Sequence, residues 1–346
     1  MPRYIKFVLL QFLCIISLEA HSVECCGGTR SLLDFKLRKF VEEHYNFNIK
    51  EISKFDYGLE NEVYKIEDTD GKIYVLRISY KKRSKVEQEI FLLQRLCNER
   101  LFVNFVPCVI ADSENKYIHI LGSQIVVLFE YIEGIQKECL DDTEVKYVVS
   151  NLAKLHEYSI KFIDYFDKRD IETSEEMKTF LQKLLEKKLI NQNFFNFLCN
   201  SVDNFHLSLK KYKFLSVVHR DVHWKNLIFT QDNKIVLIDF DDFCISSPIL
   251  ELAVLFRTMC LRNGNIDVER FIKILKEYNF YKLTGEFINT EDLLNMVIYD
   301  LLRVAKSKFE NVENKKKFKN IINQDFDYIK LIDIHRKELL YLLKVH

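Results

Sequence analysis

The chain of 346 residues is longer than one ordinary domain, and it fits either two lobes or one large α/β domain. Hydrophobic residues make up 48% and charged residues 29%, the proportions of a soluble globular protein. Lys plus Arg and Asp plus Glu number 51 each, and this zero net charge argues against a nucleic-acid partner, which usually selects a basic excess.

The first 28 residues resemble a secretory signal peptide. Arg3 and Lys6 precede an apolar run over 7–18. That run is shorter than a transmembrane helix of about 20 residues, so we expect no stable membrane span. Three interpretations stay open: an export signal, an interfacial anchor, or translated sequence upstream of the true start.

The nine cysteines form no recognisable framework. Their number is odd and no C-x-x-C pair occurs, which argues against both a closed set of disulfides and a zinc site. Five of them lie in apolar or helical surroundings: Cys97, Cys139, Cys199, Cys244 and Cys260. We interpret these five as small buried hydrophobes, because free cysteine is often buried.

The first third of the chain predicts a sheet with one inserted helix. Apolar residues recur at helical spacing over 31–45, and shorter β-branched runs follow, with Asp70-Gly71 as a hairpin turn. The predicted strands cover 51–57, 61–67, 72–79, 106–112, 116–121 and 124–130, and a helix covers 84–98. This pattern is typical of a mostly antiparallel sheet.

After Gly134 helical periodicity dominates. Helices are predicted at 143–158, 174–212, 247–262, 267–278, 291–312 and 325–345, around an irregular stretch at 217–243 with short strands at 227–229 and 235–238. The predicted fold class is therefore α+β, with a small antiparallel β lobe at 29–134 and a larger helical lobe at 135–346.

One stretch carries the chemistry. It reads His219-Arg220-Asp221-Val222-His223-Trp224-Lys225-Asn226 and is followed by Ile238-Asp239-Phe240. Phosphoryl transfer needs a carboxylate for the hydroxyl proton and oxygen ligands for Mg²⁺. Asp221 is therefore the candidate catalytic base, and His223 the candidate donor to a phosphate oxygen. Asn226 and Asp239 are the candidate magnesium ligands.

The pattern H-x-D-x-H-x-x-N, followed by a short hairpin and I-D-F, resembles the aminoglycoside phosphotransferase and choline kinase family. The resemblance covers the chain from about Ser31 and implies a protein-kinase-like bilobal fold. It also implies ATP and Mg²⁺ as cofactors, and transfer of the γ-phosphate to a hydroxyl of a small molecule such as an amino alcohol, amino acid, sugar or aminoglycoside. Because ATP is a cytosolic cofactor, a cytoplasmic location is expected, unless the first residues export the chain.

The same resemblance implies a set of nucleotide-binding residues in the expected order. They are Gly58, Asn61, Arg77, Glu89, Glu130 and Ile132. The first two lie in the nucleotide loop. The next two are the basic residue of the third strand and its partner on the following helix, and the last two lie in the hinge, whose backbone would hold adenine.

Three positions depart from the family pattern. Arg220 replaces the usual glycine, Asp241 occupies the glycine position of the Asp-Phe-Gly motif of protein kinases, and Glu251 replaces the aspartate that anchors the catalytic loop. Pro248 begins the next helix nine residues after Asp239, which leaves no room for a phosphorylated loop. We therefore expect Arg220 to pair with an acidic neighbour.

Two further functions stay open. A compact protein Ser/Thr kinase would phosphorylate a protein, and a pseudokinase would bind nucleotide in a regulatory role. A polycationic aminoglycoside would need an acidic cleft, for which Asp221, Asp241, Asp242 and Glu251 are the candidates. The basic residues over 306–317 argue against that acceptor. The oligomeric state stays open.

Overall fold

The computed structural model describes residues 27–55, 61–99, 102, 104–167, 171–311 and 315–344. Packing divides the chain into two compact units. Unit 1 comprises the described residues up to Ser79 together with Ile110–Tyr131, and unit 2 comprises Tyr80–Val109 and the described residues from Ile132 onward. The lobe boundary at Gly134 stays a prediction.

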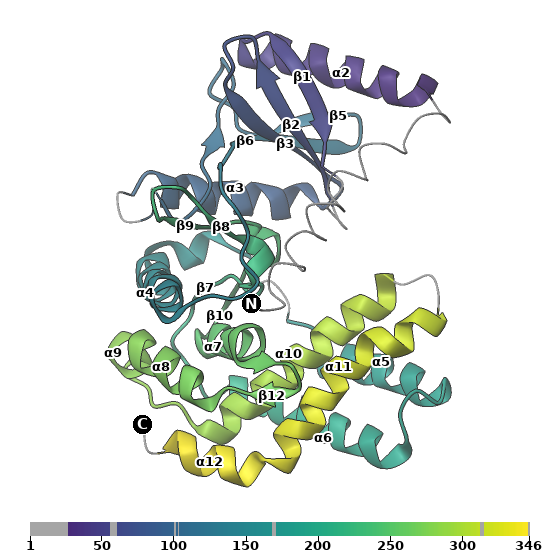
Figure 1. Cartoon of the computed structure of the whole chain (residues 1–346), viewed down its shortest axis with the longest axis vertical. Coiled ribbons are helices and arrows are strands. Elements are labelled where there is room, and N and C mark those ends of the chain that lie inside the picture. The colour runs from purple at the N-terminus through teal and green to yellow at the C-terminus, as the bar shows by residue number, and fades with distance from the viewer. Residues whose placement is uncertain are drawn as a thin grey trace, which may run out of the picture. The chain divides into compact units, whose positions relative to one another are not determined.

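Unit 1 is a six-stranded sheet covered by a helix (Figure 1). The strands are β1 (Ile49–Lys54), β2 (Asn61–Asp68), β3 (Ile73–Ser79), β4 (Val109–Ile110), β5 (His119–Leu121) and β6 (Gln124–Glu130), and the unit boundary falls within β4. Their order is β1-β2-β3-β6-β4, with β5 paired to β6. The helix α2 (Gly27–Tyr45) shares an apolar core with the sheet, in which Leu37 and Ile66 are fully buried.

The β2–β3 hairpin confirms the turn predicted at Asp70-Gly71. The Asp68 carboxylate accepts hydrogen bonds from the backbone N–H groups of Asp70 and Lys72, at 2.9 and 2.8 Å. Gly71 adopts a φ of +81°, which a residue with a Cβ rarely adopts. This turn fixes the antiparallel register of β2 and β3.

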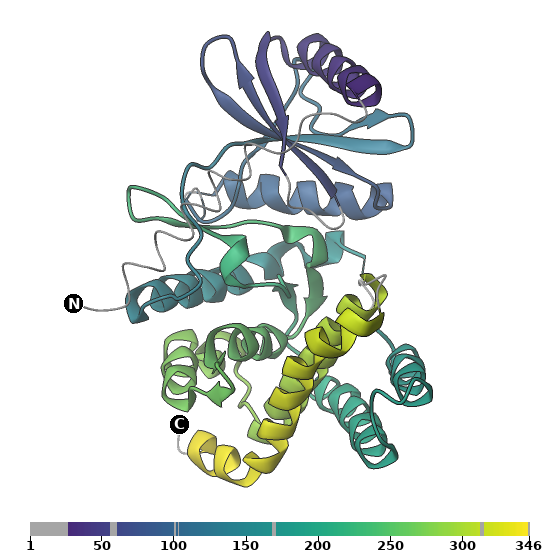
Figure 2. The ribbon, with the colours of Figure 1, turned by 45° about the vertical axis from the view of Figure 1, so that its right-hand side comes forward.

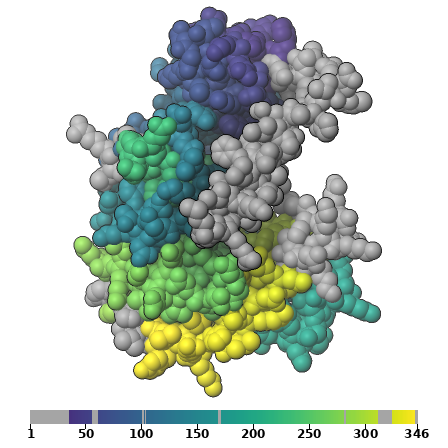
Figure 3. All heavy atoms as spheres, viewed as in Figure 1, coloured from purple at the N-terminus to yellow at the C-terminus, as the bar shows by residue number. Residues whose placement is uncertain are grey.

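Unit 2 is mostly helical. Its helices are α3 (Arg83–Cys97), α4 (Asp142–Ser159), α5 (Ser174–Glu186), α6 (Gln192–Leu209), α7 (Ile249–Leu255), α8 (Val268–Tyr278), α9 (Phe280–Thr284), α10 (Thr290–Asn311), α11 (Lys315–Ile334) and α12 (Arg336–Lys344). α10 is central, because it packs against α6, α7 and α11. Figure 2 shows α10 beside α11, and Figure 3 shows the C-terminal helices (yellow) on the surface of this unit.

Local signals end two helices earlier than the periodicity predicts. The stretch 174–212 forms α5 and α6, because Lys188 adopts a φ of +56°, outside the right-handed helical region. Asn191 then caps α6 by accepting a hydrogen bond from the Phe194 N–H at 2.9 Å. The stretch predicted at 247–262 divides into α7 and a π-helical turn, η4 (Phe256–Cys260).

The prediction for Cys97 is wrong. Cys97 and Cys108 form a disulfide bond, with their Cα atoms 5.6 Å apart, that joins the end of α3 to the segment before β4. Neither residue belongs to a recognisable cysteine motif, so only the fold reveals the pair. Among the other described cysteines, Cys139 is exposed and Cys199 half-buried, against the prediction, while Cys244 and Cys260 are buried as predicted.

Of the signal-like segment, residues 1–26 are not among those that the structure describes. Within the part of the chain that the structure describes, no helix combines the length and the apolar character of a membrane span.

Candidate active site

Two short antiparallel strand pairs in unit 2 position the predicted catalytic loop. The loop over 219–226 joins β7 (Ser216–Val218), which pairs with β10 (Cys244–Ser246), to β8 (Leu227–Phe229), which pairs with β9 (Ile235–Leu237). Ile238, after β9, is hydrogen-bonded to the loop through both its N–H and its carbonyl. Its N–H donates to the Asn226 carbonyl at 2.9 Å, and its carbonyl accepts from His219 Nε2 at 3.1 Å. Asp239 is therefore held next to the loop.

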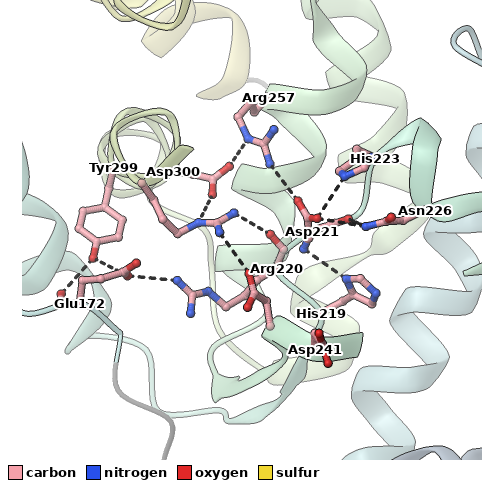
Figure 4. Close-up of polar contacts among 12 residues, drawn as sticks. Glu172, His219, Arg220, Asp221, His223, Asn226, Asp241, Arg257, Tyr299 and Asp300 are labelled. Atoms are coloured by element: carbon pink, nitrogen blue, oxygen red, sulfur yellow. Dashed lines mark hydrogen bonds and ion pairs between the residues drawn. The ribbon is translucent and has the colours of Figure 1, made fainter. Parts of the chain in front are cut away.

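Asp221 lies at the centre of a polar cluster (Figure 4). Its carboxylate lies 3.1 Å from His223 Nε2 and accepts a hydrogen bond from Asn226 Nδ2 at 3.0 Å. Arg257 Nη2 is 3.9 Å from its other oxygen. The structure thus brings three of the predicted site residues, Asp221, His223 and Asn226, into direct contact.

The Asp221 carboxylate is held in its ionised form. Burial raises its pKa, but the hydrogen bond and charge of His223, together with the charges of Arg303 and Arg257, outweigh burial and hold the pKa well below its ordinary value. An ionised carboxylate can accept the proton of a substrate hydroxyl.

Two residues of the site adopt left-handed backbone conformations. Arg220 has a φ of +68° and Asp239 a φ of +66°, values that are uncommon for residues other than glycine. Such conformations persist only where the surroundings fix them, and they concentrate at functional sites.

Side chains from two helices, Glu251 and Arg303, fix the unusual conformation at Arg220. Glu251 is fully buried on α7, and its two oxygens accept hydrogen bonds from the N–H groups of His219 and Arg220, at 2.6 and 3.2 Å. Arg303 Nη2 donates to the Arg220 carbonyl at 3.0 Å. The glutamate that replaces the usual aspartate therefore reaches the catalytic loop. His156 lies beside it, with Nε2 3.6 Å from Glu251.

The Arg220 side chain pairs with an acidic neighbour, as predicted. Its Nη2 donates to Glu172 at 3.2 Å, and Glu172 also accepts from the Tyr299 hydroxyl at 3.2 Å (Figure 4). Glu172 thus contacts the predicted catalytic loop through Arg220.

The sequence analysis did not identify three residues around Asp221, namely Arg257, Asp300 and Arg303. Asp300 on α10 is buried and accepts from the Nε atoms of Arg257 and Arg303, at 2.5 and 3.0 Å. Burial raises the Asp300 pKa, but the two arginines outweigh burial and hold that pKa below its ordinary value. The available signal was the spacing of Asp300 and Arg303, two charged residues three apart within the apolar run of a helix.

The predicted nucleotide residues divide between the two units. Arg77 is buried on β3, with its guanidinium carbon 5.1 Å from the centre of the Phe129 ring, and Asn61 begins β2. Glu89 is buried on α3, in unit 2. Because Arg77 and Glu89 belong to different units, their pairing stays a prediction.

The remaining nucleotide residues allow fewer statements. Glu130 ends β6, opposite Tyr74, and Ile132 is the first residue of unit 2 after that strand. Gly58 lies outside the described residues. Their contacts with adenine and phosphate stay predictions.

The donor set fits a magnesium ion shared with phosphates. Asn226 uses its Nδ2 for Asp221, which leaves its Oδ1 for a cation, and the exposed Asp239 adds a carboxylate. The described residues contain no group of three or more His, Cys, Asp or Glu side chains that would form an all-protein metal site. Mg²⁺ usually takes one or two protein oxygens and completes its shell with phosphates and water.

Comparison with known sequences gives two findings. The model of the phosphotransferase enzyme family (APH) matches residues 51–282. A curated relative from Meyerozyma guilliermondii, altered inheritance of mitochondria protein 9, is 30% identical over 165 residues. That match covers 41% of this chain and 26% of the relative, so the chain spans about a quarter of the relative's length.

Solved structures share the fold at low sequence identity. A spectinomycin phosphotransferase in complex with ADP and spectinomycin has a TM-score of 0.59 at 17% identity, over 86% of this chain and 94% of that chain. An amicoumacin kinase with AMP-PNP and Ca²⁺ has 0.59 at 13%, over 84% and 93%. A choline kinase from Streptococcus pneumoniae has 0.58 at 15%, over 86% and 98%. The expected protein-kinase-like α+β fold is confirmed.

Proposed function

Because the chain belongs to the phosphotransferase enzyme family, we propose that it transfers the γ-phosphoryl group of ATP to a hydroxyl of a small molecule, with Asp221 as the catalytic base. One observation carries the proposal. The N–H and the carbonyl of Ile238 are both hydrogen-bonded to the loop that contains Asp221 and Asn226. These two bonds hold Asp239, the next residue, beside that loop. The proposed base and the proposed metal ligands thus come from segments of unit 2 that are hydrogen-bonded to one another.

The proposed role of Asp221 follows from its charge and contacts. The ionised carboxylate orients the acceptor hydroxyl and takes its proton as the oxygen attacks the γ-phosphorus. His223 and Asn226 fix the carboxylate in place. Positioning of this kind supplies most of the catalysis in phosphoryl transfer, since the protein does little covalent chemistry.

The nucleotide side of the site rests on the family pattern. We assign phosphate contacts to Arg77 and the loop containing Gly58 and Asn61, with Glu89 as the partner of Arg77. Glu130 and Ile132 provide backbone contacts to adenine. The complexes of the spectinomycin phosphotransferase with ADP and of the amicoumacin kinase with AMP-PNP and Ca²⁺ support nucleotide and metal use on this fold.

Asn226 and Asp239 are the residues that would hold Mg²⁺, which when bound neutralises charge on the phosphates. Asn226 ends the loop over 219–226, and Asp239 follows β9, next to that loop. The Asn226 side chain contacts Asp221, the proposed base, directly. Loss of Asp239 should therefore affect nucleotide binding, and loss of Asp221 should affect turnover.

The test is ADP release from Mg·ATP by the full chain, measured with pools of amino alcohols, hydroxy amino acids, sugars and aminoglycosides. Asp221→Ala should lower kcat by about 10²–10⁴-fold, the contribution typical of a positioned base, and should leave Mg·ATP binding intact. Asp239→Ala should abolish Mg²⁺-dependent nucleotide binding. Asp232→Ala is the matched control, because Asp232 is exposed in the β8–β9 turn.

Each outcome separates the functions left open. Wild-type turnover in the Asp221→Ala variant would remove the base assignment. Tight Mg·ATP binding without turnover on any pool would favour a regulatory pseudokinase or a protein acceptor.

A further inference from the structure

The acidic residues around Asp221 are already paired with cations. Glu172 binds Arg220 at 3.2 Å, and Asp241 lies 3.1 Å from Lys81 Nζ. Asp242 lies 3.7 Å from the same Nζ and 3.8 Å from Arg303. Asp300 lies between Arg257 and Arg303. A polycationic acceptor would therefore have to displace internal ion pairs before it found negative charge.

Arg257 differs from the other cations of this cluster. Its Nε is committed to Asp300, but its Nη2 is shielded from solvent and makes no hydrogen bond with any residue that the structure describes. That nitrogen points toward Asp221 and stops at 3.9 Å, beyond hydrogen-bonding distance (Figure 4). A buried donor without an acceptor is costly. The Arg257 side chain as a whole keeps 14% of its surface exposed, so an oxo group of a ligand can reach part of it.

The backbone at Arg257 is also unusual. Arg257 lies in η4, the π-helical turn that follows α7, and such turns often occur at functional sites. Asp300 fixes the orientation of the guanidinium from the opposite side. Arg303 is not equivalent, because it already binds Asp300 and the Arg220 carbonyl.

We propose that the acceptor carries an anionic oxo group, a carboxylate or a phosphate, close to its reactive hydroxyl, and that Arg257 binds this group. The proposal rests on the phosphotransferase function described above. Arginine suits the task because its fork of N–H donors matches the oxygens of carboxylates and phosphates. The 3.9 Å between Arg257 and Asp221 requires the anionic group to lie near the hydroxyl.

The reaction balances without further reactants. The acceptor oxygen forms a bond to the γ-phosphorus, and the bond from that phosphorus to the β,γ-bridging oxygen of ATP breaks. ADP leaves, and the hydroxyl proton passes to Asp221 and then to solvent. The anionic group of the acceptor stays bound to Arg257 and is unchanged.

The first test uses the wild-type full chain and matched acceptors that differ in the anionic group. The carboxylate pairs are serine with ethanolamine, homoserine with propanolamine, and glycerate with ethylene glycol. Glycerol phosphate with glycerol is the phosphate pair. For one pair we expect kcat/KM to favour the anionic member by about 10- to 100-fold, the contribution of a hydrogen bond to a charged group. The pair that responds identifies carboxylate or phosphate.

The second test changes Arg257. Arg257→Lys keeps the charge but loses the fork, and Arg257→Gln loses both, so the preference for the anionic acceptor should fall stepwise, mainly through KM. If Arg257 only positioned Asp221, kcat would fall equally for both members of a pair. Arg83→Gln is the control, because Arg83 is exposed on α3 and pairs with Glu87. Thermal unfolding identifies a variant that has lost its fold.

The outcomes distinguish the two proposals. Turnover that favours the neutral or cationic members overturns the anionic acceptor and leaves the phosphotransferase function standing. A preference that survives in Arg257→Gln overturns the role of Arg257. Absence of turnover above the Asp221→Ala blank with every acceptor overturns both.

Discussion

At the scale of single residues, the proposed catalytic loop depends on backbone conformations that ordinary residues avoid. Arg220 has a positive φ. Its N–H is bonded to the buried Glu251 and its carbonyl to the half-buried Arg303. Each contact satisfies a backbone group that would otherwise be buried without a partner. The strain at Arg220 is thus fixed by residues from α7 and α10, far from the loop in sequence.

Glu251→Gln tests this dependence. The amide would place one N–H₂ group against a backbone N–H donor, so one hydrogen bond would be lost and a buried donor left unsatisfied. We expect the free energy of unfolding to fall by about 1–3 kcal/mol and ADP release to fall with it. Urea unfolding and steady-state kinetics measure the two effects.

Glu269→Gln provides the matched control, because Glu269 is exposed on α8. Wild-type stability in the Glu251→Gln protein would show that the catalytic loop does not depend on this carboxylate.

At the scale of secondary structure, periodicity predicted most elements, and local caps decided their ends. The Asp70-Gly71 turn was readable, because its chemistry lies within five residues. The break between α5 and α6 was not read, although Asn191 carries a cap signal, because apolar spacing continues across it. The short pairing of β7 with β10 was also missed, since each strand spans only three residues.

The candidate site likewise contains residues that the sequence predicts and residues that only the fold reveals. The residues of one loop and one strand end, Asp221, Asn226 and Asp239, were predictable from their spacing. Arg257 and Asp300 were not, because they come from different helices and meet Asp221 only in the folded unit. A motif records contacts that are close in sequence, and long-range contacts depend on packing.

The disulfide gives a prediction for α3. Cross-linking Cys97 to Cys108 closes a short loop, which typically contributes about 2–3 kcal/mol by restricting the unfolded chain. A Cys97→Ser, Cys108→Ser double variant should lower the free energy of unfolding by that amount, and reductant should do the same to the wild type. Urea unfolding with and without dithiothreitol measures both.

Cys139→Ser serves as the control, because Cys139 is an exposed free thiol. An unfolding midpoint that is the same with and without reductant would argue that the Cys97–Cys108 bond does not contribute to stability.

At the scale of the whole molecule, the net charge is zero, and the charged side chains of the candidate site are arranged in oppositely charged pairs. The 51 basic and 51 acidic residues balance over the chain, and the site repeats this balance in pairs. The paired groups come from η4, α10 and the loops around them. Their neutralisation is therefore a property of folded unit 2, which links the chemistry of the site to stability.

The link predicts how stability depends on pH. Asp221 and Asp300 have pKa values below their ordinary range in the folded chain, so the unfolded chain binds more protons at acid pH. Their contribution to stability is present above about pH 3.9, the ordinary aspartate value, and is lost as pH falls through the folded pKa. The unfolding free energy should therefore stay high from pH 7 to about pH 5 and fall below about pH 4.

Asp300→Asn isolates one of these groups. Removal of the carboxylate leaves Arg257 and Arg303 without their shared partner, so the free energy of unfolding at pH 7 should fall by about 3–5 kcal/mol. The loss on acidification should become shallower, because one depressed pKa is gone. Asp325→Asn is the control with the opposite sign. Burial raises the pKa of Asp325, so removal of this carboxyl group should make the free energy of unfolding fall more steeply as the pH falls. Urea unfolding from pH 7 to pH 3 measures all three proteins, and an unchanged acid slope in Asp300→Asn would contradict the linkage.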